Sequence, residues 1–85
     1  NVFLITMPAG NITFTVSNMT AGQFFYVRIL QDGTGSRTVT WFNTITWAGG
    51  SAPTLTTTGS QADLFAFFAK TSSTFDGFIV GQGIA

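Results

Sequence analysis

Apolar and polar residues alternate along several short segments of the chain. Residues 12–17 place Ile12, Phe14 and Val16 on one face of an extended strand, with polar residues between them. The fifteen threonines of the chain are β-branched and suit a half-buried, pleated surface. No segment combines helical periodicity with helix caps. We therefore predict an all-β fold.

Turn residues separate the apolar segments at short intervals. Glycine, proline, asparagine and serine gather between them, as expected where a chain reverses. The expected strands are residues 2–7, 12–17, 23–31, 37–42, 45–47, 55–57, 62–70 and 74–80. About seven or eight short strands at this spacing predict a small antiparallel β-sandwich, jelly-roll-like in topology. We expect residues 1–85 to form this single domain.

The last hairpin of the chain has two candidate turns. Asp76 and Gly77 form a strong two-residue hairpin signal. A turn at residues 71–73 instead leaves Gly77 inside a strand, where a glycine lets another backbone approach closely. We prefer the second interpretation because it keeps residues 75–80 long enough to pair with the preceding apolar strand.

Two of the expected strands, residues 24–30 and 64–69, are apolar on both faces. A single sandwich buries one face of each sheet, so the second face needs cover from a neighbouring subunit or from more of this chain. We therefore expect self-association. The candidate interface residues are Phe24, Tyr26, Leu30, Phe65 and Phe67. The alternative is that both segments are central strands of a tightly wrapped two-layer domain.

The charge content points in the same direction. The chain is 45% hydrophobic and 7% charged, with a mean hydropathy of +0.38 and a net charge of zero. A solitary small domain usually stays soluble with a net charge of about 2–8 in magnitude, so neutrality favours association. Three cations are too few for a phosphate-binding surface, and we expect no nucleic-acid partner. No apolar run approaches the roughly 18 residues of a spanning helix, so we expect no membrane insertion.

Catalytic residue types are scarce. The chain has no histidine and no cysteine, which excludes zinc sites built on them, thiolate nucleophiles and Ser-His-Asp triads. Its only carboxylates are Asp32, Asp63 and Asp76, and two of them adjoin glycines in turn-like contexts. We expect Asp32 and Arg37 to meet across a glycine-rich hairpin, and Asp63 to pair with an arginine or accept backbone donors. We expect no enzyme activity, no metal and no cofactor.

Aromatic residues are the natural candidates for binding. Tyr26, Trp41 and Trp47 suit stacking on a sugar ring or anchoring of an interface. Both tryptophans lie in alternating strands, so core packing is an open alternative for each. Trp47 is the better binding candidate because it directly precedes a glycine-rich loop. The candidate receptor-facing residues are Trp47, Gly49, Gly50 and Ser51.

Four sequence blocks follow one another in the second and third quarters of the chain. They are residues 31–41 (QDGTGSRTVTW), 47–50 (WAGG), 52–55 (APTL) and 62–64 (ADL). In this order, within about residues 22–83, they resemble a small β-domain of tailed-bacteriophage virion proteins such as tail fibres and receptor-binding proteins. The chain departs from that pattern at Ala48, where a proline often precedes the paired glycines, and in its phenylalanine-rich strand.

The resemblance implies a non-enzymatic structural module of a homotrimeric virion appendage that takes part in host attachment. Its implied partners are copies of itself, other virion proteins and a bacterial surface glycan or protein. We expect it to be the C-terminal part of a longer virion protein, and Asn1 to mark a cut point rather than a natural start. Two alternatives stay open. They are a capsid decoration or head-fibre domain with an assembly role only, and a carbohydrate-binding module of a secreted polysaccharide-degrading enzyme.

Overall fold

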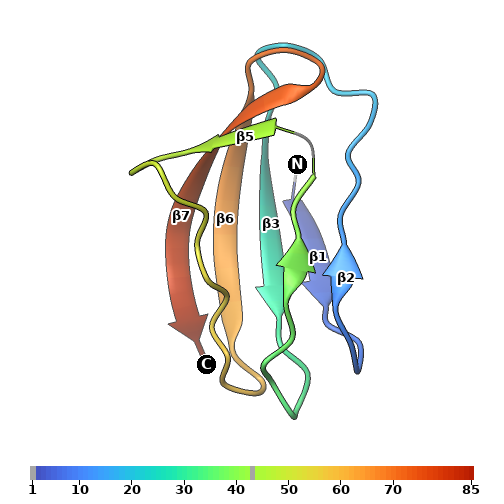
Figure 1. Ribbon diagram of the computed structural model, residues 1–85, viewed down its shortest axis with the longest axis vertical. Helices are drawn as coiled ribbons and strands as arrows, with labels where there is room; N and C mark the ends of the chain where they lie inside the picture. Colours follow the sequence, from blue (N-terminus) through green and yellow to red (C-terminus); the bar gives the residue numbers. More distant parts are fainter. Residues whose placement is uncertain (1, 43) are drawn as a thin grey trace.

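The computed structural model describes residues 2–42 and 44–85, and this part of the chain forms seven β-strands and no helix (Figure 1). The strands are β1 (Val2–Thr6), β2 (Ile12–Thr13), β3 (Phe24–Leu30), β4 (Val39–Thr40), β5 (Thr44–Trp47), β6 (Ala62–Ala69) and β7 (Thr74–Ile84). Five of them form one sheet in the order β1-β3-β6-β7-β5, while β2 and β4 form a second, small sheet. The prediction of an all-β fold is confirmed.

The expectation of a purely antiparallel fold is wrong, because the main sheet is mixed. β6 pairs antiparallel with both β3 and β7, whereas β1 pairs parallel with β3 and β5 pairs parallel with β7. The reason lies in the connections. After β1 the chain leaves the sheet to form β2 and then returns to β3 in the original direction, and such a crossover joins parallel neighbours. Strands adjacent in the sequence are therefore often not adjacent in the sheet.

Three predicted strands are much shorter in the structure or lie outside the ladders, and one of them is residues 37–42, of which β4 keeps only Val39–Thr40. β2 keeps only Ile12–Thr13, although Phe14 and Val16 still pack against the core as the alternation predicted. Residues 55–57 form no strand. Their backbone hydrogen bonds go instead to neighbouring loops and side chains, such as Ser36 N donating to Thr57 O at 2.8 Å.

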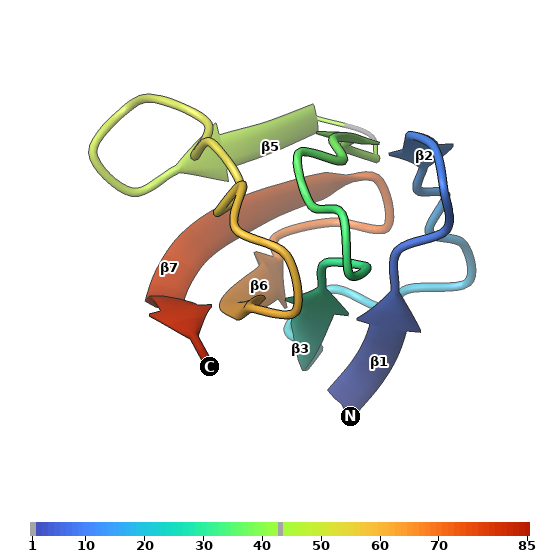
Figure 2. The same ribbon diagram turned by 90° about the horizontal axis from the view of Figure 1, so that it is seen from below.

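The hydrophobic core lies on one face of the main sheet, which we call the inner face. β2, β4 and the long connections cover this face. β5, the last strand of the main sheet, curls over onto the same side and completes the cover (Figures 1 and 2). Phe67 is at the centre, with ring centroids 5.3 Å from Phe25, 5.0 Å from Phe42 and 5.5 Å from Trp47. Such aromatic contacts each add roughly 0.5–1.5 kcal/mol to the free energy gained by burial alone.

The last hairpin turns at residues 71–73, as we preferred, and not at Gly77. The Thr71 hydroxyl oxygen accepts hydrogen bonds from the backbone amides of Ser73 and Thr74 at 3.2 and 3.1 Å. Gly77 lies inside β7, but side chains and not another backbone approach it. A β-carbon built there would lie 2.6 Å from Trp47 Cε3 and 2.8 Å from Ile45 Cγ2.

This close approach makes Gly77→Ala a test of the packing between β5 and β7. We expect a loss of about 1–3 kcal/mol in the free energy of unfolding, because the added methyl group overpacks the site. Chemical denaturation measures the change. Gly10→Ala is the matched control, since a β-carbon at Gly10 meets no atom within 4 Å. Equal stability of the two variants would contradict this packing.

Candidate functional site

The other face of the main sheet, which we call the outer face, carries apolar side chains that no part of the described chain covers. Phe24, Tyr26 and Phe78 are exposed there, as are Val2 and Leu4 of the edge strand β1. With the half-buried Leu64 and Phe68 they form what we call the outer-face patch. The patch consists of Val2, Leu4, Phe24, Tyr26, Leu64, Phe68 and Phe78.

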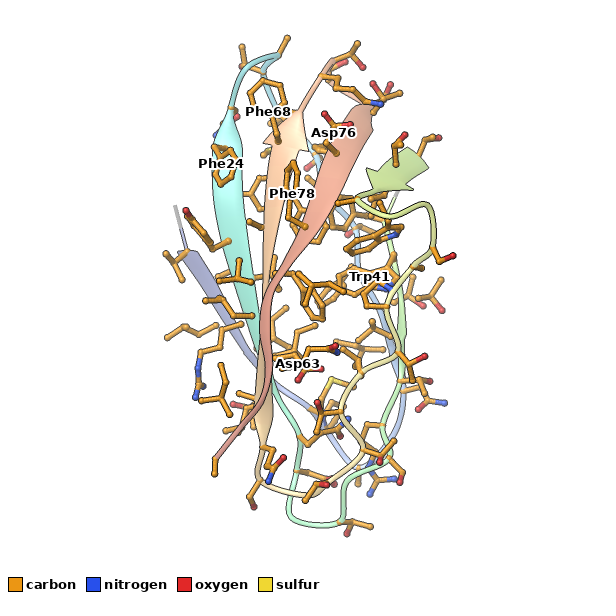
Figure 3. All side chains as sticks on the ribbon, turned by 90° about the vertical axis from the view of Figure 1, so that its left-hand side faces the viewer. Phe24, Trp41, Asp63, Phe68, Asp76 and Phe78 are labelled. Atoms are coloured by element: carbon orange, nitrogen blue, oxygen red, sulfur yellow. The ribbon has the colours of Figure 1, made fainter. Side chains whose placement is uncertain are left out.

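Strand register brings the aromatic members of the patch together. Phe24 lies opposite Phe68 across the β3–β6 ladder, while Ala66 lies between Tyr26 on one side and Phe78 on the other. The ring centroids of Phe24 and Tyr26 are 5.4 Å apart, and those of Phe24 and Phe68 are 6.3 Å apart. Figure 3 shows Phe24, Phe68 and Phe78 gathered toward the end of the sheet where β7 begins. Apolar surface of this kind marks interaction sites on soluble proteins, and the half-buried Arg28 lies on the same face between Leu4 and Leu64.

The assignment of Phe65 and Phe67 to an interface is wrong. Both side chains are fully buried on the inner face, where Phe65 lies opposite Val27 and Phe67 lies opposite Phe25. Phe24, Tyr26 and Leu30 do lie on the outer face. Because β6 is apolar on both faces, its sequence alone gave no sign of which residues point outward.

The two β6 residues that the sequence analysis missed are Leu64 and Phe68. Each lies opposite a β3 residue of the outer face, Leu64 opposite Arg28 and Phe68 opposite Phe24. Residues that lie directly opposite each other in an antiparallel ladder point to the same face. Once the register is known, the alternation in β3 therefore identifies Leu64 and Phe68 as outer-face residues.

Trp47 is also misplaced by the sequence analysis as a receptor-facing residue. It is only 8% exposed and packs edge-on against Trp41, with ring centroids 5.1 Å apart. Figure 3 shows Trp41 on the covered side of the sheet. Gly49, Gly50 and Ser51 are exposed on the loop that follows, and the turn is closed by the Gly50 amide donating to Trp47 O at 2.9 Å. The core holds the base of this loop while its tip faces solvent.

Asp32 and Arg37 form the predicted ion pair across the glycine-rich hairpin. Arg37 Nη2 and Nε donate to Asp32 Oδ2 at 2.9 and 3.1 Å, and the Gly35 amide donates to Asp32 Oδ1 at 2.8 Å. The hydrogen bonds from the Arg37 side chain and then from Gly35 lower the pKa of the Asp32 carboxyl. Both oxygens of Asp32 therefore serve to close the hairpin.

Asp63 is a buried carboxylate that joins three segments of the chain. It is 2% exposed and accepts hydrogen bonds from Thr56 N at 2.7 Å, Thr56 Oγ1 at 2.6 Å, Gly83 N at 3.0 Å and Gln82 Nε2 at 3.0 Å. Burial acts to raise the pKa of Asp63, but these four donors outweigh it, and the pKa lies below its usual value. Figure 3 shows Asp63 between β6 and the covering loops.

Gln31 continues this polar network toward the hairpin. Its side-chain amide donates to Arg37 O and Thr56 O, both at 2.9 Å, and its Oε1 accepts from Arg37 N at 3.1 Å. Gly35 is required at its position, where φ is +81° and a β-carbon would collide with the Thr57 carbonyl oxygen. Side chains of the sequence blocks at residues 31–41 and 62–64 thus hold the hairpin and the loop at Thr56 in place together.

A groove runs along the inner side of β1. Its volume is about 400 Å³. The lining is mostly apolar and includes Phe3, Ile5, Phe14, Val16 and Met19, with Thr15 and Ser17 as its polar members. The sequence analysis did not identify it, because it forms between β1 and a loop segment that has no ladder to β1.

Each of the three carboxylates has a hydrogen-bond or ion-pair partner within the described residues. Asp32 and Asp63 are held by the donors given above, and Asp76 Oδ1 lies 3.3 Å from Lys70 Nζ. In residues 2–42 and 44–85, no three metal-ligating side chains gather at one place. Within the same residues, no helical segment has the length and hydrophobicity to cross a bilayer.

Comparison with protein-family models, with curated proteins and with solved structures gives no significant match for this chain. The resemblance to bacteriophage virion domains therefore stays a prediction drawn from the order of the sequence blocks. The structure contributes the geometry of the outer-face patch, the exposed loop and the groove.

Asp63→Asn tests the polar network. An asparagine presents a donor where the carboxylate accepts, and each buried group left unsatisfied costs about 1–3 kcal/mol. We expect the free energy of unfolding near pH 7 to fall by at least that amount, as measured by urea denaturation.

The same variant has a pH signature with a definite sign. Because the folded-state pKa of Asp63 lies below its unfolded value, its contribution to stability is present above the unfolded pKa and is lost as pH falls through the folded pKa. We therefore expect Asp63→Asn to lose less stability on acidification than the parent chain. Parallel pH profiles of the two proteins would contradict this role.

Proposed function

We propose that the chain is a non-enzymatic structural module of a tailed-bacteriophage virion, from a tail fibre or receptor-binding appendage. In this proposal it assembles as a homotrimer through its outer-face patch and takes part in attachment to the host surface. In this proposal the protein belongs to the extracellular particle.

The single observation that carries the proposal is the uncovered apolar outer face. Phe24, Tyr26 and Phe78 gather on the outer face of a sheet whose other face carries the buried core. The charge of the whole chain is zero, so little electrostatic repulsion opposes association of copies. A surface with these properties is suited to lasting contact with protein and not to solvent.

The virion assignment is supported by what the resembling sequence blocks do. Gln31, Asp32, Gly35, Arg37 and Asp63 hold loops together through side-chain hydrogen bonds and close packing. Residues with that role specify a fold and not a ligand site. This agrees with the all-β module without catalytic residues that the resemblance implies.

The finer architecture belongs to the same proposal. The main sheet and the layer that contains β2 and β4 act as the two layers of a small, jelly-roll-like β-sandwich. The exposed Gly49, Gly50 and Ser51 form the receptor-facing loop, with a bacterial glycan or surface protein as the ligand. The buried Trp47 supports this loop from below and does not touch the ligand.

Two lysine substitutions on the outer face test the proposed assembly. We expect the parent chain to be a trimer by light scattering at micromolar concentration, and the double variant Tyr26→Lys/Phe78→Lys to be a monomer. Both side chains are exposed, so the far-ultraviolet circular dichroism and the folded core should be retained. Thr58→Lys, which adds a charge to an exposed loop, is the matched control and should stay trimeric. A monomeric parent, or a trimeric double variant, would refute assembly through this face.

The location of the protein tests the virion role. Antibodies raised against the chain should label tail appendages of purified phage particles in electron micrographs. Label on the head would instead support a decoration or head-fibre domain. Absence of label from particles, together with specific binding of the chain to a polysaccharide, would favour the carbohydrate-binding module of a secreted enzyme.

A further inference from the structure

The main sheet has two edges that lack a strand partner among the described residues. β1 is one edge, and we call it the β1 edge. At the other side β5 pairs with β7 from Thr74 to Gly77 and leaves residues 78–84 open, which we call the β7 edge. Neither edge contains a charged residue or a proline, two of the features by which natural edge strands avoid pairing with other chains, although the β7 edge has a bulge between Ile79 and Gly81.

The two edges match in direction and in height. β1 runs parallel to β3, and two successive antiparallel ladders make β7 parallel to both. Along the ladders, Phe3 is level with Ile79, and Leu4 is level with Gly81. Parallel edges of two copies can lie side by side when the copies are related by rotation, and closure into a ring then requires the strands to tilt and the register to stagger. A contact between different surfaces closes into a ring when its rotation divides a full turn.

The side chains of the two edges are also complementary. Ile79 is 48% exposed, and its register with Phe65 places it on the inner side of the sheet. On the β1 edge, at the same height and on the same inner side, lies the apolar groove lined by Phe3, Ile5 and Met19. A rotated copy therefore brings an exposed isoleucine to an apolar groove.

The size of the outer face also calls for contacts beyond the patch. Four strands about 4.8 Å apart and seven residues long, at about 3.3 Å per residue, give a projected area of roughly 450 Å². A stable interface usually buries about 800 Å² of each partner. The projected area of the patch is smaller than that value, and the two edges add further contact area.

We propose that neighbouring copies of this chain join the β1 edge of one to the β7 edge of the next, with Ile79 seated in the groove beside Phe3. This inference rests on the proposed self-association and adds the contact that sets its geometry. The ring encloses the outer-face patches around its axis, together with the Arg28 side of β3 from each copy. Three copies supply twelve strands, a wider ring than the eight-stranded barrel that ordinary side chains fill, and Phe24, Tyr26, Phe68 and Phe78 supply bulk for that interior.

Crosslinking tests the contact, and the cysteine-free chain is a clean background for it. Leu4→Cys and Gly81→Cys are made as two single variants, at positions that are level on the two edges. Leu4 is 75% exposed, and a β-carbon at Gly81 makes only an ordinary contact with Ile84. Within one chain the two sites are three strand spacings, about 14 Å, apart. A bismaleimide whose reach is shorter than this distance therefore joins cysteines of different copies only.

We expect covalent dimers when the two single variants are co-expressed and none when either is treated alone. A chain that carries both cysteines should give covalent trimers. Crosslinking of Leu4→Cys with itself would show two-fold pairing of β1 and overturn the proposal. An oligomeric parent whose co-expressed variants do not crosslink would overturn this contact but leave the proposed function standing, whereas a monomeric parent would overturn both.

Ile79→Lys provides a second measurement that does not depend on crosslinking. The exposed position tolerates the change in a folded monomer, but a lysine ammonium group entering the apolar groove loses its hydration. We expect loss of the trimer in light scattering with an unchanged circular dichroism spectrum, and no loss for the control Thr58→Lys. A trimeric Ile79→Lys protein would overturn the role of the groove.

Discussion

Each strand of the main sheet presents side chains alternately to two faces, and the described residues cover only one of them. The covering layer consists of β2, β4, β5 and the long connections, and beneath it Phe25, Phe65, Phe67 and Phe75 are fully buried. The opposite face keeps large apolar side chains in contact with solvent. Since burial of such side chains is worth roughly 25 cal/mol for each Å² removed from water, the uncovered face is the main source of free energy still available for association. The proposed assembly follows from this imbalance between the two faces.

The covering layer depends in turn on a small number of polar groups. Residues 48–61 form no strand, so their backbone finds partners in side chains and loops. Asp63 holds Thr56 and Gly83, and Gln31 holds Thr56 and Arg37. A buried carboxylate is expensive to desolvate, and here four donors offset that cost. The network therefore fixes an irregular segment over the sheet with a definite geometry, which strand pairing alone would not provide there.

The sequence predicted the features that depend on local pattern. The alternation in β3 placed Phe24, Tyr26 and Leu30 on one face, the spacing of Asp32 and Arg37 across a glycine turn predicted their ion pair, and the length of β7 favoured the correct turn. The features that it did not predict depend on register and order. β6 is apolar on both faces, so only its pairing with β3 separates Phe65 and Phe67 from Leu64 and Phe68. Trp47 precedes a loop, which suggested an exposed position. However, β5 pairs in parallel with β7, a pairing that no local sequence pattern predicts. This pairing directs the indole ring of Trp47 into the core.

The order of the strands has a consequence for how the chain is made. The β6–β7 ladder is the one local hairpin of the main sheet in the described residues. β3 pairs with β6, and β1 pairs with β3, only across long intervening segments of the chain. Contacts between distant parts of a chain slow folding, because the intervening loop must be closed before any of them form. During synthesis from the N-terminus, β1 and β3 leave the ribosome long before the strands that complete their sheet. Folding of this domain is therefore a late event, timed by the arrival of its last hairpin.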